Sequence, residues 1–205
     1  MSRIAVIGAG NVGGALGKRF REAGHTVVWG VPEPTNPKYE GLATATVANA
    51  TLDAEFVVFA VPWGAARAAI DSAENLVGKI VIDAMNPIAD DFSDLVPLGG
   101  ISAAEHVAKW TPGATVVKAF NTVGSNIMEN PQFGSVRATM LIASDDAEAK
   151  AAVLALAEQI GFAPVDAGPL SMARHLESFA WVWITLAAKL GHGREMVFEL
   201  LKREP

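Results

Sequence analysis

The stretch IAVIGAGNVGGALGKRFREAGHTVVWGVPEP, residues 4–34, contains the pattern that decides the fold. A short apolar run ends at a Gly-x-Gly-x-x-Gly motif, residues 8–13, and apolar residues then recur at helical spacing up to Gly24. A second β-rich run follows at residues 26–29. We therefore predict a strand at residues 3–7, a helix at residues 11–23 and a second strand, which together make one unit of a dinucleotide-binding sheet.

The same alternation continues along the chain. Further strands are predicted by the apolar runs at residues 56–61, 79–83, 115–119, 138–143 and 163–165. Helices are predicted at residues 63–76, 102–110, 145–160, 171–190 and 194–202. Strands that alternate with helices indicate an α/β fold, so we predict a doubly wound, mostly parallel Rossmann sheet with a small C-terminal helical segment. The expected division is a dinucleotide-binding domain at residues 1–167 and a helical segment at residues 168–205, which covers the cleft and contacts a second subunit.

Composition narrows the classes of partner. The 205 residues are 51% hydrophobic and carry a formal net charge of −6 without a long basic run, which argues against binding to nucleic acid or to an anionic membrane. The chain has no cysteine, so disulfides, thiolate metal sites and cysteine nucleophiles are excluded. No signal peptide or membrane-spanning run is recognisable, so we expect a cytoplasmic protein whose partner is a small molecule.

The glycine motif has a specific chemical use. Gly8 allows a tight turn from strand to helix, Gly10 lets the backbone approach a pyrophosphate, and Gly13 lets helix and strand pack closely. The phosphates then meet the free N–H groups at the start of the helix. The motif itself consists of Gly8, Ala9, Gly10, Asn11, Val12 and Gly13. These six residues are predicted to bind a dinucleotide.

The end of the second predicted strand leaves the choice of dinucleotide open. An acidic residue at this position binds the ribose of NAD, whereas an arginine binds the 2′-phosphate of NADP. Here Val31 and Pro32 are uncharged, and Glu33 lies about twenty residues past Gly13, the spacing of a ribose ligand. Lys38, with its neighbours Thr35 and Asn36, is the alternative ligand for a phosphate.

Longer motifs point to a family. FAVPW at residues 59–63, DAMNP at 83–87, VVKAFNTVG at 116–124 and PVDAGPLSMARHLE at 164–177 follow GAGNVG in that order. Together they resemble the deazaflavin-dependent NADP reductases, which pass hydride between NADPH and the coenzyme factor 420. They are also similar to the cytoplasmic domain of the six-transmembrane metalloreductases, which sends electrons from NADPH to flavin. The resemblance spans almost the whole chain.

The resemblance implies site residues and cofactors. Val61 and Pro62 would line the path from adenosine to nicotinamide, and the nicotinamide half would be faced by Asn86, Pro87, Ala119, Phe120 and Asn121. The family's usual Ser-Arg pair after the second strand is replaced by Val31-Pro32, so NADP is the favoured cofactor and NAD stays open. Trp63 lies where a predicted strand opens into the cleft, which makes it a candidate for contact with a ligand.

No set of residues forms a recognisable catalytic centre. The four histidines are scattered without the spacing of metal ligands, so no metal site is predicted. Ser171 and His175 lie four residues apart but lack a third member of a nucleophilic triad. Lys118 is the one candidate catalyst, although its place at a strand end favours a structural partner. We therefore predict no catalytic side chain, because redox cofactors carry such chemistry and the protein positions them.

The sequence thus predicts an NADP-dependent oxidoreductase that transfers hydride between NADPH and a flavin or deazaflavin. Two alternatives stay open: a non-catalytic NAD(P)-binding sensor, and a reductase of the same fold acting on another small substrate. Imine and pyrroline-carboxylate reductases fit this second alternative poorly, because they need a longer helical dimerisation domain than the roughly forty residues after Pro164. The apolar stripe at residues 172–190 predicts a helix buried on most sides, packed on the sheet and on a second copy in a homodimer. Trp181 or Trp183 on this helix is an alternative wall for the acceptor ring.

Overall fold

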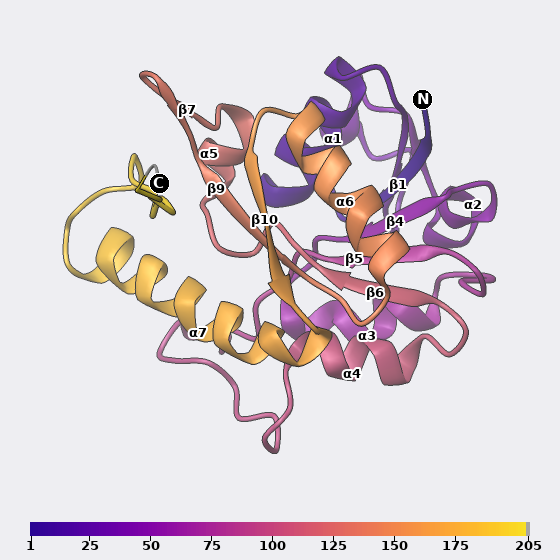
Figure 1. Cartoon of the computed structure of the whole chain (residues 1–205). Helices are drawn as coiled ribbons and strands as arrows, with labels where there is room; N and C mark the ends of the chain where they lie inside the picture. Colours follow the sequence, from indigo (N-terminus) through magenta and orange to yellow (C-terminus); the bar gives the residue numbers. More distant parts are fainter. Residues whose placement is uncertain (204–205) are drawn as a thin grey trace.

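Eight strands form one sheet in the order β10-β9-β6-β5-β4-β1-β2-β3 (Figure 1). The computed structural model describes residues 1–203. The strands are β1 (Arg3–Ile7), β2 (Thr26–Gly30), β3 (Thr44–Ala45), β4 (Phe56–Phe59), β5 (Ile80–Asp83), β6 (Thr115–Lys118), β9 (Thr139–Ala143) and β10 (Ala163–Gly168). Neighbours pair in parallel except β6 and β9, which meet antiparallel at Lys118 and Ala143. The predicted mostly parallel α/β fold is confirmed.

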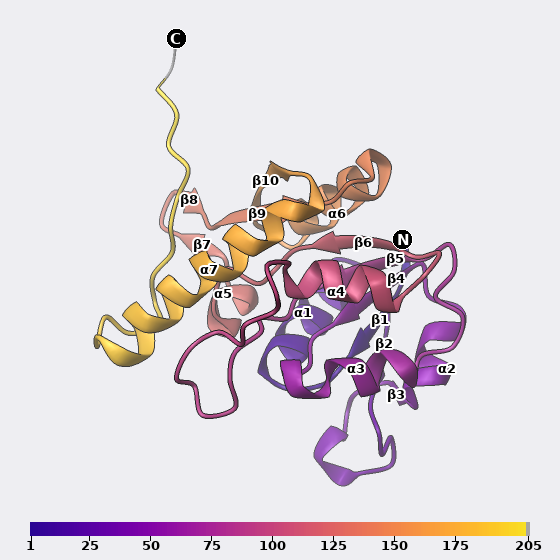
Figure 2. The ribbon, with the colours of Figure 1, turned by 90° about the horizontal axis from the view of Figure 1, so that it is seen from below.

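Helices cover both faces of the sheet (Figures 1 and 2). They are α1 (Asn11–Glu22), α2 (Val47–Leu52), α3 (Trp63–Asp71), α4 (Ala103–Trp110), α5 (Ser125–Glu129), α6 (Ala147–Gln159) and α7 (Ala173–Ile184). Buried residues of α1, α5 and α6 share one hydrophobic cluster, and those of α2, α3 and α4 share a second. No helix within residues 1–203 is long and apolar enough to cross a membrane.

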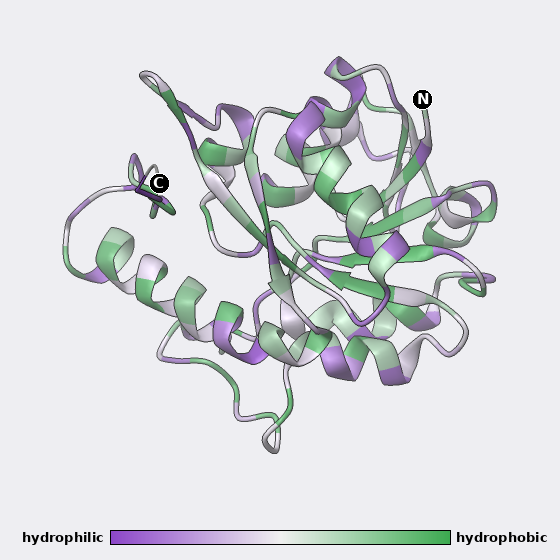
Figure 3. Ribbon diagram, viewed as in Figure 1, coloured by the Kyte–Doolittle hydropathy of each residue, from purple (hydrophilic) through white to green (hydrophobic). Residues whose placement is uncertain are grey.

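The two clusters arise from alternation along the strands. Ile4 and Val6 of β1 belong to the first cluster, whereas Ala5 and Ile7 belong to the second. Successive side chains of a strand point to opposite faces, so a central strand covered on both sides must be apolar throughout. Apolar residues accordingly predominate in the central strands of Figure 3.

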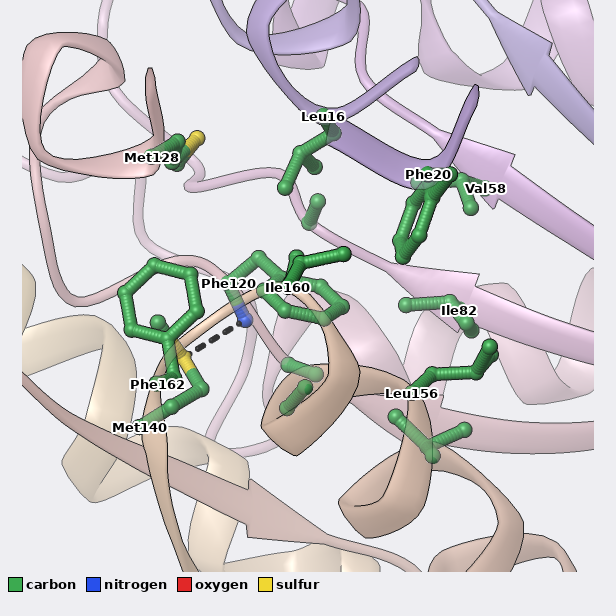
Figure 4. Packing of buried hydrophobic residues seen from close by; sticks show 14 of the residues in the cluster. Leu16, Phe20, Val58, Ile82, Phe120, Met128, Met140, Leu156, Ile160 and Phe162 are labelled. Carbon is green, nitrogen blue, oxygen red and sulfur yellow. Dashed lines mark hydrogen bonds between the residues drawn. The ribbon is translucent and has the colours of Figure 1, made fainter. Parts of the chain in front are cut away.

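Phe120 lies in the first cluster rather than in a cleft (Figure 4). Its side chain has no exposed surface, and its ring centroid lies 6.0 Å from that of Phe20 and 6.1 Å from that of Phe162. Its φ of +62° is in the left-handed region, which is rare for a bulky residue, and its N–H donates to Met140 Sδ at 3.1 Å. The nicotinamide-facing role expected of this side chain is therefore not available, and only its backbone can face a ligand.

Several elements differ from the sequence expectation. The helix expected at residues 63–76 ends as α3 at Asp71. The structure adds the short elements α2, α5 and β3, the 3₁₀ helix η1 (Pro37–Tyr39) and the hairpin β7 (Gln132–Phe133) and β8 (Val136–Arg137). These segments are too short for a hydrophobic period to be read from them.

The helix expected at residues 194–202 is wrong: these residues form an extended tail. Trp183 Nε1 donates to Met196 O at 2.9 Å, and Leu200 N donates to Thr139 Oγ1 at 3.1 Å. The ring centroids of Phe179 and Phe198 are 4.7 Å apart. Contacts with α7 and β9 thus replace the internal hydrogen bonds of a helix, so tertiary packing overrides a local preference.

The preceding helix begins later and is less buried than expected. After the 3₁₀ helix η2 (Leu170–Met172), α7 runs from Ala173 and continues as one π-helical segment, Thr185–Lys189. Leu176 and Trp183 are buried, whereas Val182 is half exposed. One side of the helix is therefore open in the single chain, and the homodimer stays a prediction.

A buried ionic cluster fastens α7 to the sheet. Lys118 Nζ donates to Asp83 Oδ2 and to Glu177 Oε1, both at 2.9 Å, and to the carbonyl of Met85 at 2.6 Å. Glu177 also accepts the N–H groups of residues 103 and 104 at the start of α4. Burial alone would lower the pKa of Lys118, but the two carboxylates outweigh it and raise that pKa. The lysine stays charged and joins β5, β6 and α7.

A second, exposed ion pair joins α7 to α4. Arg174 of α7 donates two hydrogen bonds to Glu105 of α4, at 2.7 and 2.9 Å. These bonds lower the pKa of Glu105 to about 2. Ser102 Oγ also caps the helix by accepting the Glu105 N–H, while Glu105 accepts the Ser102 N–H.

Replacing Glu177 with Ala should lower the free energy of unfolding by about 3 kcal/mol, because it leaves a buried charge cluster and two helix N–H groups incompletely paired. Arg174→Ala is the matched control, since it removes an exposed pair between the same helices and should cost about 1 kcal/mol or less. Urea unfolding followed by circular dichroism measures both. Equal, small losses in the two variants would contradict the structural role of the buried cluster.

The exposed pair should also give a pH-dependent difference. The folded-state pKa of Glu105 is depressed, so its contribution to stability is complete above the ordinary pKa of 4.5 and is lost as pH falls toward about 2. The difference in Tm between the wild type and Arg174→Ala should therefore shrink between pH 5 and pH 3. A difference that stays constant or grows over this range would refute the assignment.

Candidate nucleotide-binding cleft

The cleft lies where the strand order changes direction. From β1 the chain adds β2 on one side, and it later returns to add β4 on the other side. The helices that follow β1 and β4 therefore lie on opposite faces, and the loops at the carboxyl ends of these strands diverge. Open α/β sheets bind ligands at such a switch point.

The glycine turn after β1 is built by close contacts. Gly8 has φ +100°, and a Cβ there would lie 2.7 Å from the carbonyl oxygen of Ala60 after β4. A Cβ on Gly13 would collide with the carbonyl of Gly8. At Gly10 a Cβ would meet no atom of the described chain within 4 Å, so this residue faces open space. The turn thus has the shape of a cradle for a group outside the chain.

The two helices that follow β1 and β4 lack side-chain caps. Helix α1 starts after Gly10 and α3 starts after Pro62, and neither has a side-chain hydrogen bond at its N-terminus. By contrast Thr46, Ser102 and Asp146 cap α2, α4 and α6. An uncapped helix start presents free N–H groups and a positive partial charge, which suit an anion such as a pyrophosphate.

A first cavity of about 370 Å³ lies at the ends of β1 and β2. It is lined by Ile7, Gly8, Gly30, Val31, Pro32, Thr46, Val47, Ala48, Val61, Ala65, Ala68, Ala69 and Ser72. Val31 is buried and Pro32 is exposed. Glu33 and Lys38, two of the predicted ligands, are exposed and do not line this cavity. Its wall is mainly apolar, as an adenine ring requires.

A second cavity of about 560 Å³ adjoins the first across Val61. It is lined by Gly10, Asn11, Val12, Ala60, Val61, Pro62, Trp63, Ala84, Met85, Asn86, Ile88, Ala89, Asp90 and Phe92. Seven of these were predicted from the sequence: Gly10, Asn11, Val12, Val61, Pro62, Trp63 and Asn86. The structure therefore brings together residues from the ends of β1, β4 and β5.

Two asparagines join the loops after β5 and β6. Asn86 Nδ2 donates to the carbonyl of Asn121 at 2.8 Å, and Asn121 Nδ2 donates to Asn86 Oδ1 at 3.0 Å. Asn121 is 4% exposed, and its Oδ1 has no hydrogen-bond partner among residues 1–203. A buried acceptor without a donor is costly unless a bound group supplies one.

The other predicted residues lie behind the cleft. Ala119 is fully buried in the core beside Phe120, and Pro87 lines a separate cavity with residues of the loop that leads to α4. Ala9 packs partly against the core behind the glycine turn. These residues shape the backbone around the second cavity but do not line it.

Sequence reasoning missed the far wall of the second cavity. Ile88, Asp90 and Phe92 belong to a loop after β5 that folds back through a bridge between Ile88 and Leu95. Phe92 has φ +56° and a side chain that is 61% exposed. The signal in the sequence was an aromatic residue beside two aspartates, which is also the pattern of an ordinary surface turn.

An aromatic group supports Trp63. The ring of Trp110 in α4 stacks on it, with centroids 5.4 Å apart and an interplanar angle of 20°. The His106 ring lies 6.3 Å from that of Trp63 and 5.6 Å from that of Trp110. Trp63 is thereby held at the mouth of the second cavity.

The candidate catalyst Lys118 does not line either cavity. Its ammonium is fully buried and committed to two carboxylates and a carbonyl. Asp90 is the one ionisable side chain that lines the second cavity, and the first has none in the described part of the chain. Residues 1–203 contain no group of three or more His, Asp or Glu that could hold a metal ion.

Comparisons with known proteins agree with this geometry. The family described as "NADP oxidoreductase coenzyme F420-dependent" matches residues 3–87. A structure from Arthrobacter sp. FB24, described as an inferred F420-dependent NADP reductase, is 30% identical with a TM-score of 0.87, covering 98% of this chain and all of that chain.

Two further proteins are similar in a more limited way. One matches over only part of its length, and the other is similar in fold alone. Metalloreductase STEAP3 of Rattus norvegicus is 31% identical over 180 residues, which are 86% of this chain and 36% of that protein. This chain thus spans about a third of the length of the curated relatives it matches.

A reductive aminase from Aspergillus terreus, solved in complex with NADPH and ethyl levulinate, has a TM-score of 0.68 over 94% of this chain and 64% of that chain. At 18% identity it shows the shared fold alone. The full-length match to the Arthrobacter structure and the glycine cradle within the matched segment lead to one assignment. This chain belongs to the family of coenzyme F420-dependent NADP oxidoreductases.

Proposed function

We propose that this protein transfers hydride between NADP(H) and a flavin or deazaflavin acceptor. The observation that carries the proposal is the pair of cavities that meet at Val61 beside the uncapped start of α1. A dinucleotide bound across Val61 would place its adenosine in the first cavity and its nicotinamide in the second. NADPH supplies the hydride when it is bound.

The chain's first task is to bind the pyrophosphate. Gly10 leaves space where any side chain would stand, and the N–H groups at residues 11–13 lie in the first turn of α1. In an α-helix these groups have no partner within the helix, so they bind an anion at little cost of reorganisation.

The second task is to orient the nicotinamide. The Asn86–Asn121 pair fixes the loops at the ends of β5 and β6, beside the second cavity. Asn86 lines this cavity whereas Asn121 does not, so Asn121 acts by holding the Asn86 side chain in position beside the nicotinamide. Orientation of this kind lowers the barrier by holding the reacting carbon at near-attack distance.

The third task is to seat the acceptor and exclude water. Trp63, Met85 and Phe92 provide apolar and aromatic surface in the second cavity. Flat heteroaromatic rings stack on such surfaces, and an apolar cavity keeps water from the transferred hydride. No side chain needs to donate or accept a proton to hold two rings face to face.

The relatives support this assignment at different levels. The family description names both an NADP oxidoreductase and coenzyme F420. STEAP3 is described as a metalloreductase, and this chain aligns with 36% of it. We therefore propose a small-molecule redox acceptor, with the ring system of a flavin or deazaflavin, and a cytoplasmic location as in the sequence expectation.

Replacing Gly10 with Val should weaken NADP binding at least a hundredfold, because the side chain would fill the space at the start of α1 where the pyrophosphate lies. Isothermal titration calorimetry measures Kd. Gly14→Ala is the control: its Cβ would meet only the Ala9 carbonyl at 4.0 Å, so folding and binding should be retained. An unchanged Kd in Gly10→Val would remove the basis of the proposed site.

Replacing Trp63 with Ala should lower kcat/KM for the acceptor about tenfold, in keeping with the loss of one aromatic stacking contact. The Kd for NADP should change less than threefold. Trp181→Ala is the matched control, because Trp181 lines neither cavity and should leave both values unchanged. Steady-state oxidation of NADPH with FMN or factor 420 provides the assay, and no turnover with either acceptor would refute the proposed acceptor class.

A further inference from the structure

We propose that the adenosine end of this cleft binds NAD at least as well as NADP, because within residues 1–203 the first cavity is lined by no cationic side chain that could hold a 2′-phosphate. This inference rests on the proposed function and concerns the cofactor specificity of the same site. It departs from the preference that the family description names, and the departure originates at the end of β2.

The backbone at the end of β2 offers few donors to a phosphate. The Val31 N–H is already used, since it donates to the carbonyl of Ala45 at 3.0 Å. Pro32 and Pro34 have no N–H at all. A phosphate placed beside this strand end would therefore find fewer free N–H ligands than the residue count suggests.

The side chains of the first cavity also offer no positive charge. Its lining within residues 1–203 includes no lysine or arginine, and its hydroxyl groups belong to Thr46 and Ser72. Thr46 Oγ1 accepts the Asn49 N–H at the start of α2, and Ser72 Oγ donates to the Ala68 carbonyl at 2.8 Å. A dianionic group entering this cavity would lose hydration without gaining a counter-charge.

The two cations on the flanking segments have other partners. Lys38 Nζ lies 4.8 Å from the centroid of the Tyr39 ring, in the loop after β2. Arg67 of α3 bonds Asp71 at 2.9 Å and lies 5.5 Å from the Trp110 ring centroid. Neither lines the first cavity, so the phosphate-binding role considered for Lys38 has no geometric support.

The nearest charge along the chain has the wrong sign for a phosphate. Glu33 follows Pro32 directly, and its carboxylate accepts a hydrogen bond from Asn36 Nδ2 at 3.2 Å. Glu33 does not line the first cavity, but its negative charge in this loop repels a phosphate, which carries about two negative charges. The local charge pattern therefore favours the cofactor without the 2′-phosphate.

The experiment compares the Kd values of NADP and NAD by calorimetry for the wild type, Pro32→Arg and Pro37→Arg. Pro32 is exposed and makes no backbone hydrogen bond through nitrogen, so its replacement leaves the fold intact. Pro37→Arg is the matched control, since it adds the same charge to the loop at a residue that does not line the cavity.

The wild type is expected to bind NAD at least as tightly as NADP. Pro32→Arg should shift the ratio of the two Kd values at least tenfold toward NADP, because a guanidinium forms charge-assisted bonds with phosphate. Pro37→Arg should shift the ratio less than threefold, and Lys38→Ala should leave it unchanged.

Other results would overturn the inference in distinguishable ways. Tighter binding of NADP than NAD by the wild type would refute it while leaving the proposed function intact. A lack of response to Pro32→Arg, or a loss of NADP binding in Lys38→Ala, would show that discrimination occurs elsewhere. Binding of neither nucleotide would refute the proposed function itself, and this inference with it.

Discussion

The close approach of α1 to the end of β1 is the constraint on which the site depends. The Cβ positions at Gly8 and Gly13 are already filled by the carbonyls of Ala60 and Gly8, so no other residue fits without displacing backbone. This packing directs the start of α1 at the loop after β4. The open space at Gly10 then belongs to the second cavity, and the free N–H groups of the helix face it. A helix capped by its own side chain would hold the same fold but would offer no such anion site.

Ionic interactions in the molecule stabilise the frame rather than supply reactive groups. The Asp83–Lys118–Glu177 cluster is buried, and its ion pairs balance the charges of Asp83 at the end of β5 and Lys118 at the end of β6. Because Lys118 also bonds the Met85 carbonyl, the cluster fixes the backbone that leads to Asn86. The cleft is left with apolar and amide groups, together with Asp90 at its far wall. This division of roles agrees with hydride transfer, in which position and dryness matter more than proton exchange.

The sequence predicted the central strands and the glycine turn because their signals are local. The run at residues 3–7 has the apolar composition of a strand covered on both faces, and the glycines have defined steric roles. Residues 88–92 and Trp110 could not be found in this way, since only the folded chain brings them to Trp63 and the cavity. Phe120 was expected in the cleft but lies in the core, for a related reason. Its place after a strand indicates the cleft, but a left-handed φ turns its side chain into the core. The residues after Gly193 do not form the expected helix, because they make hydrogen bonds with α7 and β9 instead.

Backbone recognition and side-chain discrimination are separated in this fold, and that separation permits a change of cofactor. In the proposed site the pyrophosphate is bound by helix N–H groups, whose geometry is set by the packing of Gly8 and Gly13. In the same proposal the 2′ position of the ribose faces the loop after β2, where Pro32 and Glu33 are exposed. One family can therefore retain its dinucleotide site while single substitutions in that loop alter the charge opposite the ribose. The physical constraint is strong at the glycine turn and weak in the loop after β2. Family membership therefore identifies a dinucleotide-binding cleft more firmly than it identifies whether the dinucleotide carries a 2′-phosphate.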